Sequence, residues 1–96
     1  AKEYVSMNKK YIVQARVFKA MSDENRLKIL ELLHEREYNA SELLAEMDFG
    51  QSTLSHHMRI LLSAGIVQAR KNGKWTYYSL QKKAYEEMAE WLRQYL

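Results

Sequence analysis

Residues 50–67 read GQSTLSHHMRILLSAGIV, and this stretch decides the fold because its polar and apolar residues separate onto two sides of one helix. Consecutive residues of a helix point about 100° apart, so side chains three or four positions apart share a face. The side chains on one side are hydrophilic: Ser52, Ser55, His56, Arg59 and Ser63. Those on the other side are apolar, namely Leu54, Met58 and Leu61, and His57 lies near their edge. We predict a helix over residues 51–63 that ends at Ala64-Gly65, where glycine suits a left-handed cap.

The adjacent histidines of this stretch do not have the spacing of a metal or catalytic site. His56 and His57 diverge around the helix, whereas a paired helical metal site needs ligands at positions i and i+4. A nucleophile such as Ser55 needs a base and an orienting carboxylate, and the predicted helix contains no acid. The sequence therefore predicts neither a metal ion nor a catalytic residue here, and no enzyme.

The hydrophilic face suits DNA. Gln51 can form two hydrogen bonds with adenine and Arg59 two with guanine, while Thr53 and the Ser and His side chains can bond bases or phosphates. An ordinary solvated face remains the alternative, but such faces usually carry Glu and Lys, which are better helix formers. We interpret this helix as one that reads the major groove, the placement found in helix-turn-helix proteins.

A β-hairpin follows this helix. From Ile66 the apolar period changes to two, so IVQARK and KWTYYSL are predicted strands over residues 66–71 and 74–80. Asn72-Gly73 between them favours a type I′ turn. Basic and amide side chains gather at its tip, namely Arg70, Lys71, Asn72 and Lys74. We expect this tip to act as a wing on the DNA backbone or minor groove, although a merely solvated tip is the alternative. Trp75, Tyr77 and Tyr78 are expected to pack on the sheet.

The charges are segregated along the chain. No Asp or Glu occurs from Phe49 to Tyr85, a span that contains Arg59, Arg70, Lys71, Lys74, Lys82 and Lys83. A continuous span with only positive charges is stronger evidence for a polyanionic partner than the formal net charge of +3. Chance clustering on a solvated surface is the alternative.

Four further helices and a short linker or strand complete the predicted order of four helices, a hairpin and a last helix. Helices are predicted over residues 7–21 and 24–35, the second with an N-cap at Ser22-Asp23 and apolar on most sides. A short linker or strand at residues 38–40 leads to a brief helix over residues 42–47, capped by Ser41. The last helix is expected over residues 82–96. The fold class is therefore mainly α with a small β-hairpin.

Length and composition narrow the class of protein. The 96 residues suffice for one domain, residues 1–96, and an apolar fraction of 47% argues against disorder. No cysteine is present, which excludes disulfides, thiolate metal sites and thiol redox switches. Neither a long apolar span nor a signal-like start occurs, so we expect a cytoplasmic protein with no membrane partner.

Four segments together resemble the ArsR/SmtB family of winged helix-turn-helix repressors. They are FKAMSDENRLKILELL, SELLAEM, QSTLSHHMRILLSAGIV and RKNGKWTYYSL, which cover most of residues 18–80 in this order. The resemblance implies a homodimer that binds promoter or operator double-stranded DNA and is released by an effector. It also implies that Gln51, Ser52, Ser55 and His56 read DNA, supported by Arg59 and the wing.

The family also implies that the terminal helices, residues 7–21 and 82–96, pack across the two-fold axis. The sequence offers its own argument in two apolar stripes: Tyr4, Met7, Tyr11 and Phe18, and Tyr85, Met88, Leu92 and Tyr95. These stripes exceed what so short a chain buries easily, and aromatic residues and Met are enriched at interface cores. The alternative is that both helices only cap the core of one chain.

The family's sensor sites are missing. Metal-sensing members carry a Cys-x-Cys pattern where this chain has Asn39 and Ser41, and others carry His on the last helix, which has none here. We therefore expect no metal, no cofactor, and an effector that is a small molecule, a protein or nothing. His34 is expected to be structural. A winged-helix module that binds a protein through its basic face remains the alternative function.

Overall fold

The computed structural model describes residues 2–95, with side-chain surroundings given for residues 9–95. Its elements, in chain order, are α1 (Lys2–Met21), α2 (Glu24–Glu35), β1 (Tyr38–Asn39), α3 (Ala40–Ala45), α4 (Gln51–Ser63), β2 (Val67–Asn72), β3 (Trp75–Leu80) and α5 (Lys82–Arg93). The predicted order and class are confirmed, and the bounds of α2 and α4 coincide with the prediction. α1 begins five residues earlier than predicted, α3 lies two residues earlier than predicted, and α5 ends at Arg93, three residues before its predicted end. Among the described residues, no helix is both long and apolar enough to cross a membrane.

Local capping sets the starts of α2 and α3. The Asp23 carboxylate accepts hydrogen bonds from the backbone N–H groups of Asn25 and Arg26 at 2.9 and 3.1 Å. Asn39 and Glu42 form a reciprocal capping box, with the Glu42 N–H donating to Asn39 Oδ1 at 2.8 Å and the Asn39 N–H to Glu42 Oε1 at 2.9 Å. The predicted cap at Ser41 is therefore wrong, because Asn39 satisfies the first turn and starts α3 at Ala40.

The three strands form one antiparallel sheet in the order β1-β3-β2. Tyr38 pairs with Tyr78, and the hairpin runs from the pair Val67–Leu80 to the pair Asn72–Trp75. The turn therefore has Gly73 and Lys74 at its centre, and only Gly73 has a positive φ, at 64°. This is the pattern of a type II′ turn rather than the predicted type I′, because glycine occupies the first central position.

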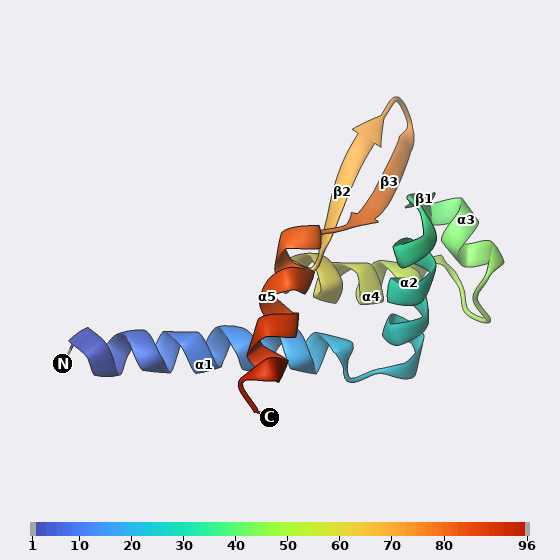
Figure 1. Cartoon of the computed structure of the whole chain (residues 1–96). Helices are drawn as coiled ribbons and strands as arrows, with labels where there is room; N and C mark the ends of the chain where they lie inside the picture. The colour runs from blue at the N-terminus through green and yellow to red at the C-terminus, as the bar shows by residue number, and fades with distance from the viewer. Residues whose placement is uncertain (1, 96) are drawn as a thin grey trace.

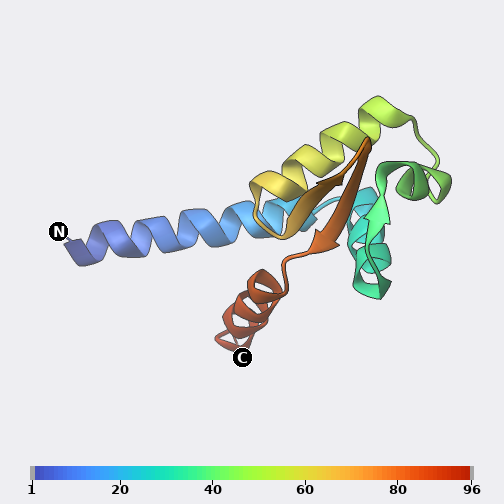
Figure 2. The same ribbon diagram turned by 90° about the horizontal axis from the view of Figure 1, so that it is seen from above.

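The core lies where α2, α4 and the base of the hairpin meet. Its fully buried side chains are Ile29, Leu43, Met58, Leu61 and Ile66. Leu27 is 49% exposed, so α2 is buried on fewer sides than predicted. The N-terminal half of α1 projects away from the other elements, and the hairpin stands out beyond the helices (Figures 1 and 2).

Candidate nucleic-acid interface

One side of α4 is open to solvent along its length. Its exposed polar side chains are Gln51, Ser52, Thr53, Ser55, His56 and Arg59, which we call the polar face of α4. Within residues 9–95 none of these side chains forms a hydrogen bond or ion pair with the chain. Leu54, Met58 and Leu61 on the opposite side are buried, as the spacing predicts. The polar face therefore has its hydrogen-bonding capacity available for a partner.

His57 belongs to the buried side of α4 and holds this helix against α2. Its Nδ1 lies 3.0 Å from the Nη1 of Arg26, and its ring lies 5.4 Å from that of Phe49. A guanidinium only donates, so Nδ1 accepts and the ring is neutral, with its proton on Nε2. Burial lowers the pKa of His57, which favours the same neutral form. No local pattern in the sequence indicates the role of Arg26, whose Nε also donates to the Ala20 carbonyl at 2.6 Å.

The wing, residues 67–80, carries most of the side chains predicted to contact DNA at its tip. Lys71, Asn72 and Lys74 are exposed there. Arg70 differs, because it forms two hydrogen bonds with Glu37: Nη2 to Oε1 at 2.5 Å and Nε to Oε2 at 3.3 Å. Its guanidinium also lies over the Tyr77 ring. The acid that pairs with this arginine lies 33 residues earlier, before the acid-free block, so no local sequence pattern indicates the contact.

Trp75 is 44% exposed, contrary to the expectation that it packs on the sheet. It pairs with Asn72 at the far end of the hairpin, where no helix lies against it. The Lys74 ammonium lies 5.4 Å from the centre of the Trp75 ring. Tyr77 and Tyr78, closer to the helices, are partly buried, and burial raises the pKa of Tyr78. Trp75 is thus an exposed aromatic side chain on a basic hairpin tip.

The terminal helices divide their apolar stripes between the chain's own core and solvent. Met88 is buried, Tyr85 is partly buried, and Phe18 packs edge-on against Trp91 with ring centres 6.0 Å apart. Tyr11, Leu92 and Tyr95 are more than half exposed. The predicted interface side chains Tyr4 and Met7 lie outside the described side chains. Ile12 and Val13 add exposed apolar surface to α1 that the sequence analysis did not single out.

Comparisons with known proteins agree on one family. The sequence profile of the bacterial regulatory protein arsR family matches residues 23–69. An uncharacterised helix-turn-helix transcriptional regulator of Methanocaldococcus jannaschii is 46% identical over 70 residues, which cover 72% of this chain and 79% of that protein. The chain belongs to the ArsR family of transcriptional regulators.

Two further matches extend over most of this ArsR-family chain. The transcriptional repressor SdpR of Bacillus subtilis is 31% identical over 80 residues, covering 83% of the chain and 89% of the relative. The structure of an ArsR-like transcriptional regulator from Rhodococcus sp. RHA1 has a TM-score of 0.81 at 28% identity, covering 88% and 80%. The winged-helix fold and the class of regulator, rather than enzyme, are therefore shown.

The family's metal-sensing positions have other uses in this ArsR-family chain. Asn39 caps α3 through the reciprocal bonds with Glu42, and Ser41 is exposed. Across the described residues, His, Cys, Asp and Glu nowhere gather in a group of three or more that could hold a metal ion. The ring centres of His56 and His57 are 5.7 Å apart with the rings tilted by 56°, and only His57 points into the core.

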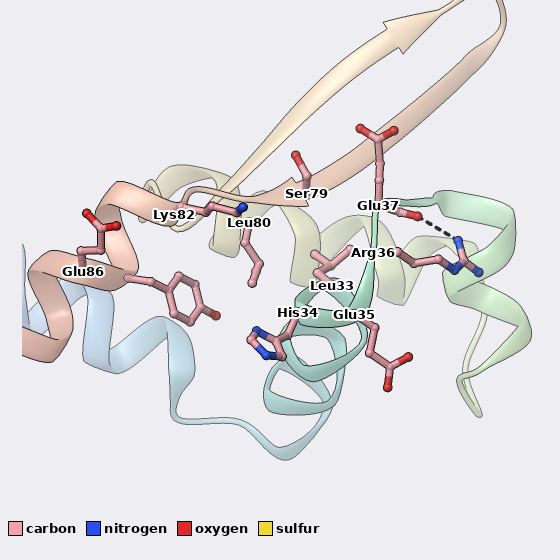
Figure 3. A pocket seen from close by; sticks show the side chains of 10 residues that line it. Leu33, His34, Glu35, Arg36, Glu37, Ser79, Leu80, Lys82 and Glu86 are labelled. Atoms are coloured by element: carbon pink, nitrogen blue, oxygen red, sulfur yellow. Dashed lines mark hydrogen bonds between the residues drawn. The ribbon is translucent and has the colours of Figure 1, made fainter.

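A hollow of about 570 Å³ lies between the end of α2, β3 and the start of α5. Figure 3 shows Leu33 and Leu80 within it, His34 below them, and the charged side chains of Lys82 and Glu86 beside the start of α5. Tyr85 also lines it, and burial raises the pKa of its hydroxyl. Charges of both signs surround the apolar floor, so the chemistry of this hollow selects no one class of ligand.

Proposed function

We propose that this ArsR-family regulator is a cytoplasmic homodimeric repressor that binds operator DNA through the polar face of α4 and the wing. The observation that carries the proposal is that the polar face of α4 is exposed, lacks acids and makes no side-chain bond within the described residues. Short polar side chains on such a helix can approach base edges in the major groove, where Gln51 suits adenine and Arg59 suits guanine.

The wing supports binding beside the recognition helix. Lys71 and Lys74 at its tip are exposed cations that suit the phosphates flanking the groove. Asn72 can donate to the same backbone, whereas Arg70 reaches DNA only when it leaves Glu37. We therefore assign the main wing contacts to Lys71, Asn72 and Lys74 and a secondary one to Arg70.

A second copy of the chain accounts for the exposed apolar surface of the terminal helices. The exposed apolar side chains are Tyr11, Ile12 and Val13 on α1, Leu92 on α5, and Tyr95 just after α5. Packing α1 and α5 across a two-fold axis would bury these side chains and place two copies of α4 about 34 Å apart, one turn of DNA. Asn39 and Ser41 stand where metal sensors of the family carry cysteine ligands. The proposal therefore excludes an effector metal that is bound through these two positions by thiolates.

The test measures binding to duplex DNA from upstream of the chain's own gene by fluorescence anisotropy, with a scrambled duplex at the same salt. We expect preference for the upstream duplex and, in His56→Ala, a loss of that preference of about 1–3 kcal/mol. His34→Ala is the matched control, because His34 is also an exposed helical histidine but lies at the end of α2. Equal weak binding to both duplexes would reject DNA reading and favour a protein partner for the basic face.

A further inference from the structure

A second hollow, of about 340 Å³, lies between α1, α2 and α4 and is lined by four cationic side chains. Arg16 and Lys19 come from the end of α1, Arg26 from the start of α2, and Arg59 from α4. The rest of the lining consists of Ala20, Ile60 and Ser63. No acidic side chain lines this hollow, which we call the basic cavity.

The four cations have no anionic partner within residues 9–95. The ion pairs there join Arg36 to Glu42, Arg70 to Glu37 and Arg93 to Glu90. The nearby Asp23 carboxylate caps α2 and makes no ion pair with Arg26. Like charges held around one space repel each other, more so where part of the lining is apolar, so an anion in the cavity would lower the free energy of the group.

Arg26 is already oriented for such an anion. Its Nε donates to the Ala20 carbonyl and its Nη1 to His57 Nδ1, both neutral acceptors, and the nearby Asp23 carboxylate attracts its charge without forming an ion pair. Nη2 donates to no atom of the described residues. A planar guanidinium held in place loses little rotamer freedom on binding and matches the geometry of a tetrahedral oxyanion.

The basic cavity adjoins the polar face of α4. At about 100° per residue, Ser63 and Arg59 lie on the same side of α4 as Ser52 and His56, and Ile60 lies at the edge toward α1. A duplex whose major groove receives α4 would therefore bring a backbone phosphate beside the cavity.

We propose that the basic cavity binds a phosphate group through Arg16, Lys19 and Arg26, beside the Arg59 side chain that faces the major groove. The phosphate has two possible sources, the backbone of bound DNA or free phosphate in solution. Binding of a backbone phosphate rests on the proposed DNA-binding function, whereas binding of free phosphate does not. Two measurements separate them, with Arg16→Gln and Lys19→Gln as the variants because both side chains are exposed and hold no other element in place.

The first measurement is the dependence of duplex affinity on salt concentration. A lost phosphate contact weakens binding to all sequences alike and reduces the slope of log K against log salt by about 1. We expect this reduction in Arg16→Gln and in Lys19→Gln on both the upstream and the scrambled duplex. Lys10→Gln is the matched control, since it removes one exposed cation of α1 outside the cavity and should keep the wild-type slope.

The second measurement titrates inorganic phosphate into the protein alone at constant ionic strength and follows the arginine Nε–H resonances by NMR. A saturable shift of the Arg26 resonance that is lost in the double variant Arg16→Gln/Lys19→Gln would identify free phosphate as a ligand. A reduced salt slope without such a shift would identify the DNA backbone.

An unchanged salt slope together with no saturable phosphate binding would overturn the proposal. If the wild-type protein bound no duplex at any salt concentration, the proposed function would fail and the phosphate titration alone would decide the role of the cavity. Thermal unfolding of each variant shows whether the fold is retained.

Discussion

His57 lies in the helical core with its Nδ1 facing a permanent cation. Arg26 donates to that nitrogen, Phe49 covers one side of the ring, and His56 and Asp23 are the nearest other titratable groups. A proton on Nδ1 would remove the hydrogen bond and set a second positive charge against the guanidinium. Because the same ring anchors α4 to α2, its protonation state bears on the position of the polar face.

The protonation of His57 predicts a pH dependence of stability. Burial holds its pKa below the ordinary value of 6.5, so the unfolded chain binds more protons than the native one in the window below 6.5. The stability contributed by the neutral ring is fully present above about pH 6.5 and is lost as the pH falls through the lower native pKa. We expect the Tm, followed by circular dichroism at fixed chain concentration, to fall between about pH 7.5 and about pH 5.

A smaller fall is expected in His57→Gln, whose amide oxygen can accept from Arg26 and does not titrate. His34→Gln serves as the control, because His34 is exposed on α2 and makes no hydrogen bond with a described residue. The Tm of His34→Gln should fall with decreasing pH as much as the Tm of the wild-type protein. If all three proteins lost Tm equally over this range, His57 would not be its source.

Two contacts join the wing to the segment that follows α2. β3 pairs with β1 through Tyr38 and Tyr78, and Arg70 of β2 bonds Glu37, which lies between α2 and β1. The hydrogen bond and charge of Glu37 raise the pKa of the Arg70 guanidinium, which stays charged. The ion pair is exposed and therefore contributes little to stability, but in the proposed complex it would compete with DNA phosphates for Arg70.

Glu37→Gln is therefore expected to strengthen DNA binding. The change removes a negative charge beside the wing and releases Arg70 to contact phosphate, so the salt slope should steepen by up to about 1 and affinity at low salt should rise about two- to tenfold. Glu35→Gln removes an acid two residues earlier, at the end of α2, and controls for net charge. Anisotropy titrations that show weaker binding in Glu37→Gln would mean instead that the pair orients the wing.

The whole chain is more extended than its length requires. The Cα radius of gyration is 15.0 Å, whereas a compact domain of this length has about 12 Å. Two elements extend beyond the rest, the N-terminal half of α1 and the hairpin of β2 and β3 (Figure 1). A helix whose N-terminal half projects and whose Tyr11, Ile12 and Val13 are exposed has the shape expected of half an interface.

Helices whose bounds depend on local interactions were predicted correctly from the sequence, whereas side-chain contacts between residues far apart in the chain were not. α2 was placed correctly because Asp23 caps it, and α4 because its apolar spacing and Gly65 mark its end. Asn and Ser are both common N-cap residues, so the sequence alone does not choose between Asn39 and Ser41. The hydrogen bonds with Glu42 identify Asn39 as the cap. The polar face followed from helical spacing. The pairs Arg26–His57 and Arg70–Glu37 span 31 and 33 residues and depend on how α2, α4 and the strands pack, which no local pattern reveals.

The proposed dimer makes its own prediction for α5. Leu92 is 56% exposed, so a charge there costs one chain little but would be buried without a partner in the interface. Leu92→Glu should sediment as a monomer and, with one α4 per molecule, lose duplex affinity by about a hundredfold or more. Gln94→Glu adds the same charge about 200° around the helix and should stay dimeric. A Leu92→Glu protein that remained dimeric would place the interface elsewhere, leaving the exposed face of α1 to meet its partner without α5.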